Sequence, residues 1–268
     1  MGIISLAQKE SILWLGRYTE RVYTTIRFFA PYYDRMIDSP EDMHQDFCAK
    51  LEIPDIYESR EDFLRRYCFD RENPDSIASN LVRAYDDAIV LREMLGTETL
   101  CYVQLALYEM QKAAASEAPM MELQKVMDNI VAFWGSADDS IDEIQVRDIL
   151  VTGRRIERVD LYARLRVGRE EIRRFVMRLA SRLKRSGLPY DPKLLEQMMM
   201  DASLPEPDYA GIIREVESLW IAGNQSPRVR RRIAYARSAQ QSGIGSGNMD
   251  FRHWGSVCNK DGYERKRI

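Results

Sequence analysis

Two eleven-residue segments of the chain carry the same charged pattern, Gly-Arg-x-x-Glu-Arg-Val. The first segment spans residues 12–22, the second spans residues 149–159, and they match at seven positions with a constant offset of 137. The charged side chains of this pattern are Arg17, Glu20, Arg21, Arg154, Glu157 and Arg158. Guanidinium groups bind carboxylates and phosphates through paired hydrogen bonds. These six residues are therefore the first candidates for a charged network or an anion-binding site.

One interpretation of the two segments is structural, and we favour it. Side chains three or four residues apart lie on one side of a helix, so the charged residues of each segment can meet. If the segments face each other across a pseudo-twofold axis, Arg21 can reach Glu157 while Arg158 reaches Glu20. Removing one partner of such a buried pair strands a charge, at a cost of roughly 3–5 kcal/mol.

The second interpretation is that the segments bind a ligand. Four arginines exceed two glutamates by two positive charges, and this surplus could hold the carboxylate or phosphate of a small molecule or peptide. Asn80 and Arg83 would extend such a pocket. We favour a simpler interpretation, in which Asn73 and Ser76 cap a helix while Asn80 and Arg83 lie on a solvated or interhelical face. Acid–base catalysis by the glutamates is disfavoured, because neighbouring arginines lower the pKa of a carboxyl group. No catalytic residue is identified.

The sequence lacks the residues that other common catalytic, metal and nucleotide sites require. His44 and His253 are the only histidines, which argues against a histidine-based catalytic triad or a histidine metal site. No glycine-rich loop follows a predicted strand, so a P-loop or a dinucleotide-binding unit is not expected. We expect neither a bound metal nor a cofactor.

The elements that must position the charged residues are helices. The chain has 268 residues, of which 45% are apolar and 30% charged, and long stretches lack strand-like alternation. Trp14, Tyr18, Val22 and Ile26 recur at spacings of four, which predicts a helix over residues 5–34. The fold class expected is all-α, a multi-helix bundle with an internal pseudo-duplication.

Further helix boundaries follow from capping residues and glycines. Asn73 to Ser76 predict a helix start, and Gly96 predicts its end; Thr97 or Thr99 then caps the next helix, which continues to Met110. The remaining predicted helices run from about residue 123 to Gly135, from Asp138 to near Gly168, and over residues 169–186, 192–202 and 209–220.

Charge divides the chain into a body and a tail. Residues 1–224 are expected to form one helical domain, with halves of about 1–118 and 119–224 packed together. The stretch from Pro227 to the end has ten Lys or Arg and three acids, so the remainder has a net charge of −10. Residues 225–268 are predicted to form a flexible basic tail. The acidic body argues against nucleic acid as a partner.

Composition also bears on the compartment. The four cysteines show no Cys-x-x-Cys spacing, no apolar signal segment is recognised at the start, and no run of eighteen or more apolar residues occurs. We expect a cytoplasmic protein without a membrane segment.

Several motifs in order resemble the bacterial alpha-E family, named for a predicted α-helical domain with a Glu-Arg motif. Besides the two charged segments, they are Trp14-Leu-Gly-Arg-Tyr18, Phe69-Asp-Arg-Glu-Asn-Pro-Asp-Ser-Ile77, Asn80-Leu-Val-Arg-Ala84, Leu91-Arg-Glu-Met-Leu95 with Glu98, and Phe133-Trp-Gly135. The resemblance covers roughly residues 3 to 220.

The resemblance implies a partner more than a reaction. Alpha-E proteins are similar in being encoded beside, or fused to, circularly permuted ATP-grasp ligases, which form amide or peptide bonds. The expected function is therefore a non-catalytic accessory partner of such a ligase. A substrate-binding or catalytic subunit that uses the arginines for an anionic ligand is the alternative, and a purely structural homo-oligomer is a third class.

Overall fold

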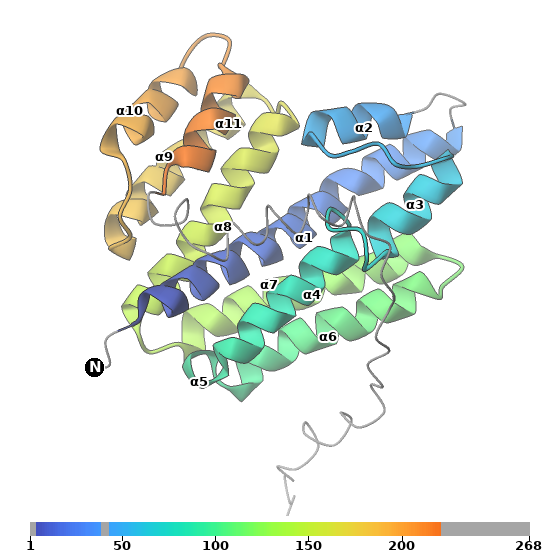
Figure 1. Cartoon of the computed structure of the whole chain (residues 1–268), viewed down its shortest axis with the longest axis horizontal. Coiled ribbons are helices and arrows are strands. Elements are labelled where there is room, and N and C mark those ends of the chain that lie inside the picture. Colours follow the sequence, from blue (N-terminus) through green and yellow to red (C-terminus); the bar gives the residue numbers. More distant parts are fainter. Residues whose placement is uncertain (1–3, 39–42, 221–268) are drawn as a thin grey trace, which may run out of the picture. The chain divides into compact units, whose positions relative to one another are not determined.

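The computed structural model describes residues 4–38 and 43–220 and confirms the all-α class. This part of the chain contains eleven α-helices and no strand (Figure 1). They are α1 (Leu6–Asp38), α2 (Met43–Leu51), α3 (Arg60–Phe69), α4 (Ile77–Val90), α5 (Arg92–Leu95), α6 (Thr97–Ala114), α7 (Pro119–Ser140), α8 (Ile144–Arg164), α9 (Arg169–Ser186), α10 (Pro192–Asp201) and α11 (Tyr209–Ser218). None of the described helices is long and apolar enough to cross a membrane.

Helix α1 is the central element, packed against α8, α4 and α7 (Figure 1). Its contacts with α8 advance along both helices in the same direction: the backbone of Leu13 meets Gly153, Arg21 meets Glu157, and the ring of Phe28 meets Tyr162. Helix α8 packs in turn on α9 and α11, while α4 and α7 pack on α6. The two charged segments therefore lie on two adjacent central helices.

The apolar stripe predicted for α1 forms part of the core. Tyr18, Val22 and Ile26 are buried, whereas Trp14 is half-buried. The helix continues four residues beyond its predicted end at residue 34 and contains Pro31. Near that end, an aromatic cluster fills the space between α1, α2 and α3. Its members are Phe29, Phe47, Phe63 and Tyr67.

Some predicted helix boundaries are wrong. Ser76 caps α4 through its hydroxyl, as predicted, but Asn73 instead accepts a hydrogen bond from the backbone of Asp75 in a turn before the helix. The single helix predicted between Ser76 and Gly96 is divided at Leu91 into α4 and α5, and Gly96 ends α5 with φ = 76°. Neither Thr97 nor Thr99 caps α6. Thr97 is the first residue of α6, and the buried Thr99 hydroxyl hydrogen-bonds to Ser136 of α7.

The predicted end of a helix at Gly135 is also wrong. Helix α7 continues through Gly135 to Ser140, and α8 begins at Ile144 instead of near Asp138. A glycine within a helix disfavours it by only about 1 kcal/mol, which the packing of α7 on α6 outweighs. The predicted tail, residues 225–268, lies outside the described residues.

Two glycines allow the close approach of α1 and α8. A Cβ atom added to Gly16 would overlap the carbonyl oxygen of Leu150, and one added to Gly153 would overlap the carbonyl oxygen of Leu13. These obstacles are backbone atoms of a neighbouring helix, so a side-chain rotation cannot relieve them. Both charged segments therefore contain glycine at this position because the two backbones touch there.

Gly16→Ala and Gly153→Ala should each lower the free energy of unfolding by about 1–3 kcal/mol or more, since one helix must move to admit the methyl group. The matched control is Gly135→Ala, because no neighbouring atom lies within 4 Å of a Cβ at this helix-interior position. That change should instead stabilise the protein by about 0.5–1 kcal/mol. Chemical denaturation measures both effects, and a stability of Gly16→Ala equal to wild type would contradict the close approach.

Candidate functional site

Glu157, on α8, is fully buried between two arginines of α1. Arg17 donates a hydrogen bond from Nε to Oε2 of Glu157 at 2.7 Å, and Arg21 donates from Nε to Oε1. Burial alone would raise the pKa of Glu157, but the charges and hydrogen bonds of Arg21 and Arg17 hold it below its ordinary value. Glu157 is therefore a fixed negative charge and a poor proton acceptor.

Glu20, on α1, has the reciprocal arrangement. Arg158 of α8 donates to both of its carboxylate oxygens, from Nε at 2.6 Å and from Nη2 at 2.8 Å. The Nε of Arg154 lies 3.7 Å from Glu20, and the Thr24 hydroxyl donates to it at 2.8 Å. The pairing predicted between the two segments, Arg21 with Glu157 and Arg158 with Glu20, is thus confirmed. We call these four arginines and two glutamates the crossed network.

The first arginine of each segment also stacks on a tryptophan. The guanidinium carbon of Arg17 lies 4.6 Å from the centre of the Trp14 ring, and that of Arg154 lies 3.5 Å from the centre of the Trp134 ring. Burial, opposed by the charge of Glu20, lowers the pKa of Arg154 to about 10. Arg154 therefore stays positively charged at neutral pH, and its charge is shared between a carboxylate and an aromatic face.

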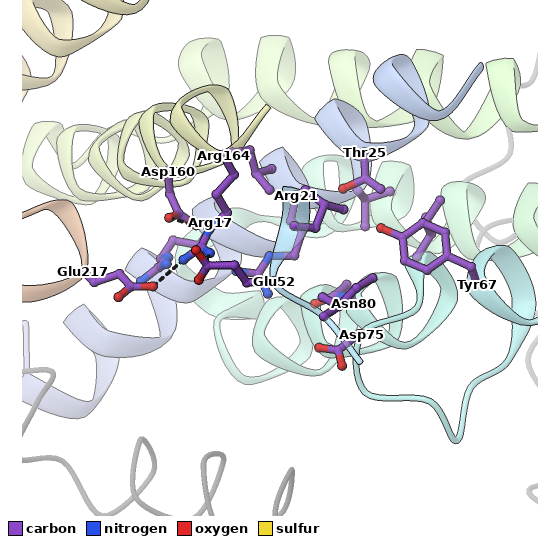
Figure 2. Close-up of a pocket in the computed structure, with 15 residues that line it drawn as sticks. Arg17, Arg21, Thr25, Glu52, Tyr67, Asp75, Asn80, Asp160, Arg164 and Glu217 are labelled. Atoms are coloured by element: carbon purple, nitrogen blue, oxygen red, sulfur yellow. Dashed lines mark hydrogen bonds and ion pairs between the residues drawn. The ribbon is translucent and has the colours of Figure 1, made fainter. Parts of the chain in front are cut away.

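A cavity of about 300 Å³ adjoins one end of the crossed network (Figure 2). Of the predicted site residues, Arg17, Arg21 and Asn80 line it. Arg154, Arg158 and Arg83 are not among its lining residues. We call it the Arg17–Arg21 cavity.

The polar residues of α4 have mainly structural contacts. The Asn80 amide donates to the carbonyl of Ser76 at 2.7 Å, and Arg83 donates to the carbonyl of Pro74 at 2.8 Å. These bonds hold the start of α4 and the loop before it. Asn80 thus combines a structural hydrogen bond with a place in the cavity wall.

Sequence reasoning missed a second charged cluster in the same wall. Arg164 forms ion pairs with Asp160 at 3.0 Å, Glu52 at 2.6 Å and Glu217 at 2.5 Å. Burial, and then the negative charge of Glu157, raise the pKa of Asp160 to about 6. The positions of Asp160 and Arg164, three and seven residues after Glu157, are a helical-face signal that could have identified them. Glu217 carries no such signal, because it comes from α11.

The fold and this arrangement define an all-helical protein with two central helices joined by crossed arginine–glutamate pairs. The chain belongs to the Alpha-E family, described as a predicted alpha-helical domain with a conserved ER motif, whose match covers residues 8–184. That range contains both charged segments and ends within α9. Neither the curated proteins nor the solved structures include a match to this chain.

Glu157→Gln should lower the free energy of unfolding by about 3–5 kcal/mol, because it leaves Arg17 and Arg21 without their buried counter-charge. Glu52→Gln is the matched control: Glu52 also pairs with an arginine, but its side chain is 64% exposed. The control should cost about 1 kcal/mol or less. Urea denaturation compares the two, and equal losses would contradict a special role for the crossed network.

Asp160→Asn tests the raised pKa of Asp160. Its pKa is about 6 in the folded protein, whereas an aspartate in an unfolded chain titrates near about 3.9. The stability gained from protonation is fully present below about pH 4 and is lost as the pH rises through about 6. The stability of Asp160→Asn relative to wild type should therefore increase between about pH 4.5 and pH 7. A constant or decreasing difference in urea titrations at these two pH values would refute the shift.

Proposed function

We propose that this protein is a non-catalytic accessory partner of an ATP-grasp-type amide ligase in the cytoplasm. The single observation that supports a non-catalytic role is the state of Glu20 and Glu157. Both carboxylates are fully buried and held by arginines, so neither is available to accept a proton from a substrate. The identity of the partner, an ATP-grasp ligase, is inferred from the family resemblance alone.

A partner of this kind acts through a fixed shape. The crossed network and the glycine contact join α1 to α8, and these two helices pack in turn on α4, α7, α9 and α11. Such a body can present a constant surface to a ligase or hold part of its substrate. It does not need a reacting group of its own.

The test combines this chain with a purified circularly permuted ATP-grasp ligase from the same organism. We expect the two to elute together in size-exclusion chromatography, and we expect the chain to increase amide formation and ADP release by the ligase. The ligase alone and the ligase with an equal concentration of serum albumin are the controls. No complex, together with unchanged turnover over a range of concentrations, would refute the proposed partnership.

The second candidate function is that of a substrate-binding subunit in the same amide-forming pathway. The observation that favours it is the Arg17–Arg21 cavity, in which two guanidinium groups of the crossed network reach open space. A carboxylate or phosphate of the substrate would bind there. In this case a cavity variant that still binds the ligase should fail to increase amide formation.

A further inference from the structure

Several polar groups around the Arg17–Arg21 cavity lack a hydrogen-bond partner among the described residues. The Tyr67 side chain is only 2% exposed, and its hydroxyl points into the cavity (Figure 2). The buried Thr25 hydroxyl also has no partner in that part of the chain. Arg17 and Arg21 bind Glu157 through Nε alone. Their Nη groups make no hydrogen bond to any described side chain or backbone group. All four residues line the cavity, so a small molecule in that space can supply the missing hydrogen-bond partners.

One wall of the cavity also contains a carboxylate without a partner. Asp75, half-buried in the loop before α4, makes no side-chain hydrogen bond or ion pair with another described residue. Burial raises the pKa of Asp75, against the opposing charges of Arg21 and Arg83. In Figure 2, Asp75 and Asn80 lie at one side of Arg21, and Arg17 with Arg164 lies at the other. The cavity thus offers free donors and a free anionic acceptor.

The balance of charge decides which ligand fits. Three arginines are in or behind the wall, namely Arg17, Arg21 and Arg164, against five carboxylates, namely Glu52, Asp75, Asp160, Glu217 and the network residue Glu157. A dianion such as phosphate would add charge to a site that already has an excess of carboxylates. A ligand with one carboxylate and one ammonium group leaves the charge unchanged and satisfies both kinds of group.

We propose that the Arg17–Arg21 cavity binds a small zwitterion of the amino-acid or short-peptide class. Its carboxylate lies against the Nη groups of Arg17 and Arg21, with hydrogen bonds from Tyr67 and Thr25, and its ammonium group lies against Asp75. A volume of about 300 Å³ suits a ligand of this size. The inference deepens the second function proposed above and rests on it for the use of the ligand, whereas binding itself requires no ligase.

The experiment measures binding to this chain alone, by isothermal calorimetry and by thermal shift. The probes are glycine, L-leucine, L-glutamate, L-lysine and the dipeptide L-alanyl-L-alanine, with inorganic phosphate as the purely anionic probe. At least one zwitterion should bind and raise the melting temperature. Its N-acetylated form and its C-terminal amide should each bind about tenfold more weakly or worse, because each lacks one of the two charges.

Two conservative variants test the assigned groups without removing a structural contact. Asp75→Asn should weaken binding of the free zwitterion by about tenfold but leave binding of the N-acetylated form unchanged. Tyr67→Phe should weaken both forms. The matched controls are Asp139→Asn, at an exposed position on α7, and Tyr162→Phe, a buried tyrosine outside the cavity. Both controls should bind as wild type does.

Three results would overturn the proposal. They are no binding by any zwitterion, equal binding of the free and blocked forms, and tighter binding of phosphate than of every zwitterion. The ligase assay separates this outcome from that of the proposed function. A chain that joins and stimulates the ligase but binds no zwitterion refutes only this inference, whereas zwitterion binding without a ligase complex refutes only the partnership.

Discussion

The contact between the backbones of α1 and α8 is the constraint on which the rest of the structure depends. At Gly16 and Gly153 the two helices approach so closely that neither position has space for a methyl group. At this separation, Glu20 and Glu157, one turn further along, lie within reach of the arginines of the opposite helix. The repeated glycine therefore brings the two helices close enough for the repeated Glu-Arg residues to pair.

Burying two glutamates and partly burying four arginines would be costly without this geometry. Each carboxylate is matched by two guanidinium groups, and two of the arginines also stack on tryptophan rings. Arginine suits this position better than lysine, because a planar guanidinium can bind a carboxylate through one edge and keep further donors for a second group. Arg17 and Arg21, which hold Glu157, also line the Arg17–Arg21 cavity, so the packing of the two helices determines the position of the proposed binding site.

The sequence predicted the helices and the crossed network but not the cavity, for a physical reason. Some features of the structure follow from local sequence patterns. The apolar stripe of Tyr18, Val22 and Ile26 shows which face of α1 is buried, and the repeated charged segment shows which arginines and glutamates can pair. The cavity wall combines residues from separate elements, including Asp75 before α4 and Glu217 on α11, whose proximity depends on tertiary packing alone. The cap predicted for α6 was wrong for a similar reason. Thr99 has a side chain suited to capping, but it lies within α6, where its hydroxyl hydrogen-bonds to Ser136 of α7.

Equivalent positions after the two segments explain why the cavity lies on only one side of the network. The counterpart of Asp160 at the offset of 137 is Tyr23, whose ring packs against Trp134 at 5.1 Å on the side of Glu20. The counterpart of Leu161 is Thr24, whose hydroxyl is bonded to Glu20 itself. On that side an aromatic ring and a hydroxyl occupy the space and satisfy the carboxylate. On the side of Glu157 the corresponding residues are Asp160 and Leu161, which line the Arg17–Arg21 cavity. The two segments therefore make reciprocal contacts through Glu20 and Glu157 but differ in their surroundings, with close packing beside Glu20 and a cavity beside the arginines that hold Glu157.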